Sequence, residues 1–238
     1  MQALSVHAWL RWSAVERLLP PDAHDVLEIG AGLGAFGAML SRRFEYVGLE
    51  PDEQSQRIAF DRTMGKVRLE SVEQHEGMYD LVCAFEVLEH LEGDAAALRI
   101  WSEHTRRWLL LSVPMNPDRF GPTDVHAGHF RRYSREGLIS TLREAGLIPR
   151  QLVAYGFPAG YLLEAIRNMI VSRRTSPEAM QDRTAASGRW LQPPRILRTL
   201  TWGLASPFRL AQRPFGSGAY GTGLVALAER PQPARRGS

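Results

Sequence analysis

A short apolar stretch that runs straight into a glycine-rich loop is the feature that most constrains how this chain can fold. Residues 25–30 (DVLEIG) have the length and apolar character of a buried strand, and two more glycines, Gly32 and Gly34, follow at once. Glycines at a strand end let the backbone turn tightly and approach a ligand without a Cβ in the way. Residues 35–44 are predicted to form the next helix, whose first N–H groups would face that ligand. This order predicts an open α/β sheet.

The rest of the chain continues the alternation of strands and helices. The predicted strands are 46–51, 67–73, 79–86, 108–114, 149–157 and 221–230. The predicted helices are 7–19, 52–63, 93–107 and 134–147, the last with Ser134 as its cap. Such alternation favours a mostly parallel sheet with helices on both faces.

Composition and length favour a single domain over residues 1–238. The chain has 238 residues, 44% of them apolar, which is enough to build a core. Its one cysteine, Cys83, excludes an intramolecular disulfide and suits a reducing compartment. We find no run of 18 apolar residues and no signal-peptide pattern, so we expect a cytoplasmic protein.

Charge is unevenly distributed between two parts of the chain. Residues 1–159 carry a formal net charge of −5, and residues 160–238 carry +8. A nucleic-acid groove in the first part would be basic, so no nucleic acid is expected as a partner.

The glycine loop by itself allows two kinds of ligand. Gly30, Gly32 and Ala35 satisfy a dinucleotide fingerprint, and Glu50 lies where its ribose-binding acid belongs. However, Glu28 stands two residues before the first glycine, where dinucleotide-binding folds usually carry an apolar residue. A carboxylate at that point suits a ligand with a cationic end.

Residues 28–34 and the stretch YDLVCAFEVLEHL (79–91) together resemble the class I S-adenosylmethionine (SAM)-dependent methyltransferases. The group most similar to this chain includes the ubiquinone-biosynthesis O-methyltransferases and many natural-product and glycan-modifying enzymes. The resemblance covers 25–157 and resumes at 221–230. It implies a Rossmann-like seven-stranded sheet, mostly parallel, with an antiparallel last strand and SAM at the carboxyl ends of the first strands.

The resemblance also assigns cofactor-binding residues by position. It implies that residues 28–34 cradle the methionine part of SAM and that Glu50 accepts both ribose hydroxyls. Residues 71–72 would flank the adenine, and residues 85–86 would line the methionine side. The full implied set is Glu28, Gly30, Ala31, Gly32, Gly34, Glu50, Pro51, Ser71, Val72, Phe85 and Glu86.

Histidines are the candidates for the catalytic base that a hydroxyl acceptor would need. His129 and His90 are the two we favour, and His126 is a third. Glu86, Glu89 and His90 follow the spacing i, i+3, i+4 of one helix face and could hold a metal if His126 or His129 joined them. We expect no metal here. Instead, Glu86 and His90 would shape the junction between SAM and the acceptor, and Glu89 would support the start of a helix.

A helical insertion at 158–220 separates the last two strands. In its first helix, 161–174, one face carries Leu162, Ala165, Ile166, Met169 and Ile170. Residues 195–215 form a second apolar and basic stretch. The insertion is either a lid over the acceptor or, through 161–215, a surface that contacts a membrane or a lipid-linked substrate. We favour the lid.

The sequence therefore predicts a SAM-dependent methyltransferase acting on a hydroxyl, or an amine, of a small molecule such as a sugar, glycolipid or secondary metabolite. One alternative is a metal-assisted RNA 2′-O-methyltransferase. Another is a catalytically silent SAM-binding subunit, and an NAD-binding protein is a third.

Overall fold

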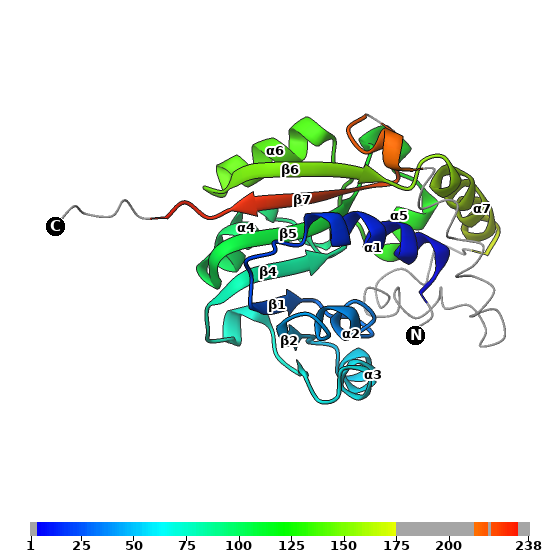
Figure 1. Ribbon diagram of the computed structural model, residues 1–238. Helices are drawn as coiled ribbons and strands as arrows, with labels where there is room; N and C mark the ends of the chain where they lie inside the picture. Colours follow the sequence, from blue (N-terminus) through cyan, green and yellow to red (C-terminus); the bar gives the residue numbers. More distant parts are fainter. Residues whose placement is uncertain (1–3, 175–211, 219, 233–238) are drawn as a thin grey trace.

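Seven strands form one sheet in the computed structural model, which describes residues 4–174, 212–218 and 220–232 (Figure 1). The strands are β1 (Asp25–Ile29), β2 (Glu45–Leu49), β3 (Val67–Arg68), β4 (Tyr79–Phe85), β5 (Thr105–Pro114), β6 (Ile148–Tyr155) and β7 (Gly223–Glu229). Their order is β3-β2-β1-β4-β5-β7-β6. Pairs from β3 to β5 are parallel, whereas β7 is antiparallel to both β5 and β6. The predicted sheet, with its antiparallel last strand, is confirmed.

Two apolar layers cover the sheet. Helices α1 (Val6–Leu18), α2 (Gly37–Leu40) and α3 (Glu53–Thr63) pack on one face, and α4 (Asp94–Glu103) and α6 (Arg135–Glu144) pack on the other. Alternate residues of the central strands enter the two layers, because successive side chains of a strand point to opposite faces. Val26 and Leu81 belong to the first layer, whereas Leu27 and Val82 belong to the second.

The carboxyl ends of the parallel strands meet at one edge of the sheet. The strand order reverses between β1 and β4, and the crevice outside such a reversal is where open α/β sheets bind ligands. Helices α5 (Pro122–Ala127) and α7 (Ala159–Arg174) lie at this edge (Figure 1). Short 3-10 turns complete it at Val72–Gln74, Leu88–His90, Pro117–Arg119 and Arg213–Phe215.

Several predicted boundaries were wrong. The helix expected at 35–44 is only the single turn α2, and the strand expected at 67–73 ends at Arg68. Residues 105–107 belong to β5 rather than to the preceding helix, because Thr105 is fully buried and pairs with Tyr79 of β4.

The short helix α5 was not predicted at all. It begins at Pro122, where a missing N–H costs nothing, and the carboxylate of Asp124 accepts a hydrogen bond from the Gly121 N–H at 2.9 Å. By contrast, the predicted cap of α6 is confirmed, since the Ser134 hydroxyl accepts from the Gly137 N–H at 2.9 Å.

The first helix of the insertion is confirmed as α7. The second apolar stretch, 195–215, lies largely outside the described residues. Among the helices described, we find none with the length and apolar character needed to cross a bilayer.

Candidate active site

The glycine loop after β1 turns through three positive φ angles. Gly30, Gly32 and Gly34 have φ of +67°, +54° and +74°. A Cβ on Gly30 would lie 2.7 Å from Val87 Cγ2, and one on Gly34 would lie 2.8 Å from the Cα of Ala59. A Cβ on Gly32 would meet no described atom within 4 Å. The first and third glycines therefore allow close packing, while Gly32 borders open space where a ligand would be accommodated.

Glu50, directly after β2, closes the loop from the side. One carboxylate oxygen accepts the Gly32 N–H at 2.7 Å, and the other accepts the Asp52 N–H at 3.0 Å. Burial raises its pKa, and these two hydrogen bonds oppose that rise. A carboxylate has about four lone-pair positions. Glu50 therefore retains the capacity to accept two further hydroxyl groups.

The remaining expected cofactor residues lie at the same edge. Ser71 and Val72 begin the turn after β3, and Pro51 is exposed beside Glu50. Phe85 ends β4 and packs edge-to-face on Phe36, with the ring centroids 5.1 Å apart. The fold therefore places the glycine loop, the end of β2 and the turn after β3 at one edge of the sheet.

Glu28 lies beneath the loop and already has a partner. Its carboxylate accepts a hydrogen bond from the Tyr46 hydroxyl at 2.6 Å, and the residue is only 2% exposed. Burial raises the pKa of Glu28 to about 8, partly opposed by the Tyr46 hydrogen bond. The group is therefore mainly neutral at pH 7 in the structure.

Glu86 has a left-handed backbone, with φ of +58°, and a carboxylate with three partners. Arg11 of α1 pairs with one oxygen at 3.0 Å. The hydroxyls of Ser112 and Tyr155 donate to the other at 3.1 and 3.3 Å. Against the effect of burial, Arg11 lowers the pKa of Glu86. Arg11 was not foreseen, because an arginine in an apolar helix carries no sequence signal of its partner.

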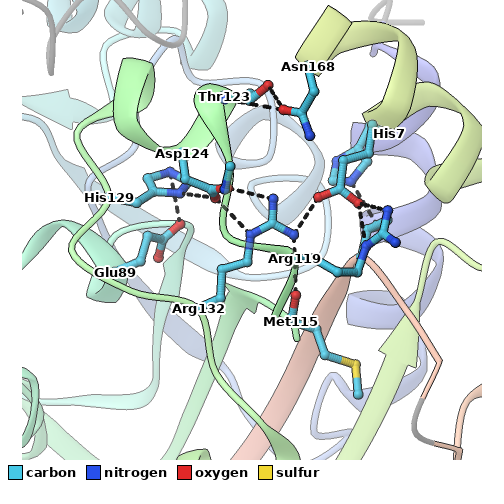
Figure 2. Close-up of polar contacts among 12 residues, drawn as sticks. His7, Glu89, Met115, Arg119, Thr123, Asp124, His129, Arg132 and Asn168 are labelled. Carbon is cyan, nitrogen blue, oxygen red and sulfur yellow. Dashed lines mark hydrogen bonds and ion pairs between the residues drawn. The ribbon is translucent and has the colours of Figure 1, made fainter. Parts of the chain in front are cut away.

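A carboxylate–imidazole pair stands beside this edge. The Nδ1–H of His129 donates to Asp124 Oδ1 at 2.9 Å (Figure 2). Although burial acts in the other direction, the hydrogen bonds from His129 and Arg132 lower the pKa of Asp124 to about 2. Asp124 is therefore ionised at neutral pH and acts as the acceptor. This fixes the tautomer in which His129 Nε2 carries a lone pair.

Asp124 was not among the residues predicted from the sequence. It stands five residues before His129, a spacing without helical or strand periodicity. The signal that could have found it is the proline-led helix start, with an acidic residue in its first turn.

Arg132 holds Asp124 in place. Its Nε and Nη2 donate to the two oxygens of Asp124 at 2.9 and 2.7 Å, and Nη1 pairs with Glu164 of α7. Arg131 pairs instead with Asp94 at 2.8 Å. Both arginines are thus committed to protein carboxylates.

Glu89, His90 and His129 form a compact cluster. One ligand atom from each lies within 4.8 Å of the others, and the His90 and His129 ring centroids are 4.7 Å apart. Burial and then Glu86 raise the pKa of Glu89 well above its ordinary value. Burial and then His129 lower the pKa of His90 to about 4. Neither oxygen of Glu89 has a hydrogen-bond partner among the described residues.

Helix α7 turns its polar face toward this site. Arg119 donates to Glu164 at 2.8 and 3.0 Å, and the Thr123 N–H donates to Asn168 at 3.2 Å (Figure 2). The apolar face is exposed instead, as the accessibilities of Leu162, Ile166, Met169 and Ile170 show. The apolar face is therefore not covered by any described part of the chain. The contacts with α5 are polar.

The chain matches the protein family described as "Methyltransferase domain" over residues 7–152. None of the curated proteins matches it.

Several solved structures are similar. One is magnesium protoporphyrin IX methyltransferase from Synechocystis PCC 6803 with bound SAH. It is 14% identical, with a TM-score of 0.51 over 95% of this chain and 81% of that chain. A SAM-dependent methyltransferase from Thermotoga maritima, described as a possible histamine N-methyltransferase, is 15% identical. Its TM-score is 0.57 over 95% of this chain and 91% of that chain. A mycolic acid cyclopropane synthase with bound SAH is 14% identical, with a TM-score of 0.53 over 94% and 82%.

At these identities the likeness shows a shared fold. The three named proteins differ in the molecules that their names mention, so the fold does not specify an acceptor.

Proposed function

Because this chain belongs to the methyltransferase-domain family, we propose that it is a SAM-dependent enzyme that methylates a hydroxyl, or an amine, of a small molecule, with His129 as general base. The family match favours SAM over a dinucleotide. It does not distinguish the ubiquinone-biosynthesis group from other members. The acceptor class, a sugar, glycolipid or secondary metabolite, remains part of the proposal.

The residues at the glycine loop fit SAM. Gly32 borders open space, and Glu50 beside it can accept two more hydroxyl donors, which suits a ribose. When bound, SAM supplies a methyl group already activated by its sulfonium. The chain's own residues must then orient the acceptor and remove its proton.

The observation that carries the proposed mechanism is the Asp124–His129 pair. Asp124 is held by Arg132 and accepts the Nδ1–H of His129, so Nε2 of His129 is the basic nitrogen. We propose that Nε2 takes the proton of the acceptor's O–H group. SAM, when bound, would supply the methyl group that takes the proton's place on oxygen, and its sulfur would keep the electron pair of the broken methyl–sulfur bond. Asp124 stabilises the imidazolium that results.

His90 has a positioning role in this mechanism. Its ring lies edge-on to His129, and its pKa of about 4 keeps it neutral at working pH. A neutral ring here orients His129 without opposing its protonation.

The test begins with calorimetric titration of SAM. It continues with transfer of a labelled methyl group to a panel of catechols, sugars and primary amines. His129→Gln should lower kcat by about 10²–10⁴-fold, while the SAM affinity stays within a few-fold. His126→Gln, in the same segment, is the matched control and should change kcat by less than about threefold. Wild-type turnover in His129→Gln would refute the base assignment. Failure of SAM to bind would refute the proposed function.

A metal-assisted transfer, such as RNA 2′-O-methylation, is the second candidate function. The observation that favours it is the cluster of Glu89, His90 and His129, in which Glu89 is fully buried and lacks a hydrogen-bond partner among the described residues. Against it, Glu86 is committed to Arg11, and residues 1–159 are acidic. We expect full activity after exhaustive dialysis against EDTA. Loss of activity that Mg²⁺, Mn²⁺ or Zn²⁺ alone restores would establish the metal-assisted alternative.

A catalytically silent SAM-binding subunit is the third alternative. It is countered by the intact Asp124–His129 pair, which a merely binding protein would not need. SAM binding without transfer to any acceptor of the panel would favour the silent subunit.

We propose that α7 is a lid over the acceptor rather than a membrane-binding element. Its polar face contacts α5, which carries Asp124. The exposed apolar face, with Leu162 at 66% accessibility, supports the membrane alternative. Co-sedimentation with anionic liposomes distinguishes the two. Salt-sensitive binding that is lost in Arg173→Gln/Arg174→Gln would overturn the lid assignment.

A further inference from the structure

Helix α7 brings three polar side chains to the edge where the site lies. Glu164, Arg167 and Asn168 follow the spacing i, i+3, i+4, which places them on one side of a helix. Glu164 binds Arg119 and Arg132, and Asn168 binds Thr123. These contacts fix that side of α7 against α5, so Arg167 faces the same region.

Arg167 differs from its two neighbours on α7 because it has no partner within the described part of the chain. It is half-buried, yet it makes no hydrogen bond or ion pair with any described residue. Burial lowers the pKa of its guanidinium, and the nearby charge of Arg11 lowers it further. Glu86, Glu164 and Asp124 act in the opposite direction, so Arg167 lies within electrostatic reach of both α1 and α5.

The nearby carboxylates are already used by other arginines. Arg11 pairs with Glu86 at 3.0 Å. Arg119 pairs with Glu164 at 2.8 Å.

Arg132 is the remaining arginine of this group, and it pairs with Asp124 at 2.7 Å. Each of these three carboxylates is therefore already paired with an arginine other than Arg167.

An uncompensated, partly buried cation is unfavourable in a folded protein, where a buried charge is usually paired. A guanidinium is also the group best suited to bind a carboxylate or phosphate through two parallel hydrogen bonds. An anionic group on a bound ligand would therefore supply the counter-charge that this cation lacks.

We propose that Arg167 binds an anionic group, a carboxylate or a phosphate, on the acceptor whose hydroxyl or amine is methylated. This inference rests on the proposed function, since it assigns the acceptor's chemical class. Arg131 and Arg132 are not available for this role, because both are paired within the protein. The lid helix would then select the acceptor by charge, and Arg167 would be a specificity-determining residue.

The first experiment measures anion binding without turnover. Thermal unfolding is followed in rising concentrations of sodium phosphate or sodium benzoate, with sodium chloride at equal ionic strength as reference. We expect saturable stabilisation of the wild type, and loss of that stabilisation in Arg167→Gln. Arg167→Lys should keep part of it. Arg150→Gln is the matched control, because Arg150 is exposed and pairs with Glu229 at the far end of the edge strand.

The Arg167→Gln variant is expected to fold, so a lost response to added anions would not come from unfolding. Arg167→Gln removes an unpaired cation, so without added anion the variant should melt at or above the wild-type temperature. Stabilisation that is equal in wild type and Arg167→Gln, or equal for all salts, would overturn the proposal.

The second experiment uses matched acceptors with S-adenosylhomocysteine present. We expect 3,4-dihydroxybenzoate to bind at least tenfold more tightly than catechol, or glucose 6-phosphate at least tenfold more tightly than glucose. The first result identifies a carboxylate and the second a phosphate. Arg167→Gln should reduce the preference to less than about threefold. If SAM binds and methyl transfer depends on His129, but neither anionic probe is preferred, then this inference alone is wrong. If SAM does not bind, the proposed function has failed.

Discussion

Replacing Glu28 by glutamine should stabilise the protein at neutral and alkaline pH. The wild-type carboxyl is 2% exposed, accepts one hydrogen bond from Tyr46 and has a pKa raised by burial from 4.5 to about 8. Glutamine has nearly the same shape, and its amide oxygen can accept the same hydrogen bond. The substitution therefore removes the titration without opening a cavity.

The magnitude follows from the difference between the two pKa values of Glu28. The folded protein keeps this proton up to about pH 8, whereas the unfolded chain releases it near 4.5. The folded state binds more protons in this window, so the free energy of unfolding falls as pH rises through it. One pKa unit corresponds to about 1.36 kcal/mol. The wild type should thus lose about 3 kcal/mol by pH 7 and about 5 kcal/mol by pH 9.

Urea unfolding followed by tryptophan fluorescence at several pH values measures this effect. The difference between Glu28→Gln and wild type should grow by about 1.4 kcal/mol per pH unit between pH 5.5 and 7.5. Glu45→Gln, at the exposed first position of β2, is the matched control and should differ by less than about 0.5 kcal/mol at every pH. A difference for Glu28→Gln that does not change with pH would show that Glu28 is ionised throughout, and the reasoning would be refuted.

The same residue gives a prediction for ligand binding. If the carboxylate of Glu28 meets a cationic group of SAM, binding must favour the ionised form. SAM binding to the wild type at pH 7 should therefore release a proton, and the calorimetric enthalpy should depend on the ionisation enthalpy of the buffer. Glu28→Gln should abolish that dependence and weaken SAM by at least tenfold. Binding enthalpies independent of buffer would mean that Glu28 has only a structural role.

Three further predictions concern the site and its supports. Asp124→Asn should lower the free energy of unfolding by about 2 kcal/mol at neutral pH, because folding lowers the pKa of Asp124 from 3.8 to about 2. In an acid titration, the wild type should lose the same stabilisation as the pH falls from about 4 through 2. Arg11→Gln leaves the partly buried Glu86 without its cation and should lower the free energy of unfolding by about 2 kcal/mol in urea unfolding. Arg57→Gln, in an exposed pair, should lower it by less than about 0.5 kcal/mol. Gly34→Ala should lower the melting temperature more than Gly32→Ala, because only the former places a Cβ against the Ala59 backbone; equal shifts would contradict this account.

The sheet and the glycine-loop edge were predictable because their signals are local. A strand that ends in glycines has few conformations available, and its apolar residues demand burial whatever lies elsewhere in the chain. Glu50 could be placed at the end of β2 because the strand fixes where its last residue stands. The capped start of α6 at Ser134 was predictable for the same reason, since cap and helix lie within four residues.

Boundaries and partners were less predictable. The start of β5 at Thr105 depends on pairing with β4, and that contact comes from a segment more than 20 residues away. The raised pKa of Glu28 comes from its burial, which only the assembled fold creates, and it is partly opposed by the hydrogen bond from Tyr46 on the neighbouring strand. Neither effect leaves a trace in the local pattern.

The sequence by itself determined the order of strands and helices, the glycine loop and the family, because periodicity and backbone freedom are properties of neighbouring residues. Only the tertiary structure decided that Asp124 accepts the Nδ1–H of His129, that Glu86 pairs with Arg11, and that α7 turns its polar rather than its apolar face toward α5. Those outcomes depend on side chains from distant segments that meet in a region of low dielectric. There, each charge must find a counter-charge, and the fold determines which one it finds.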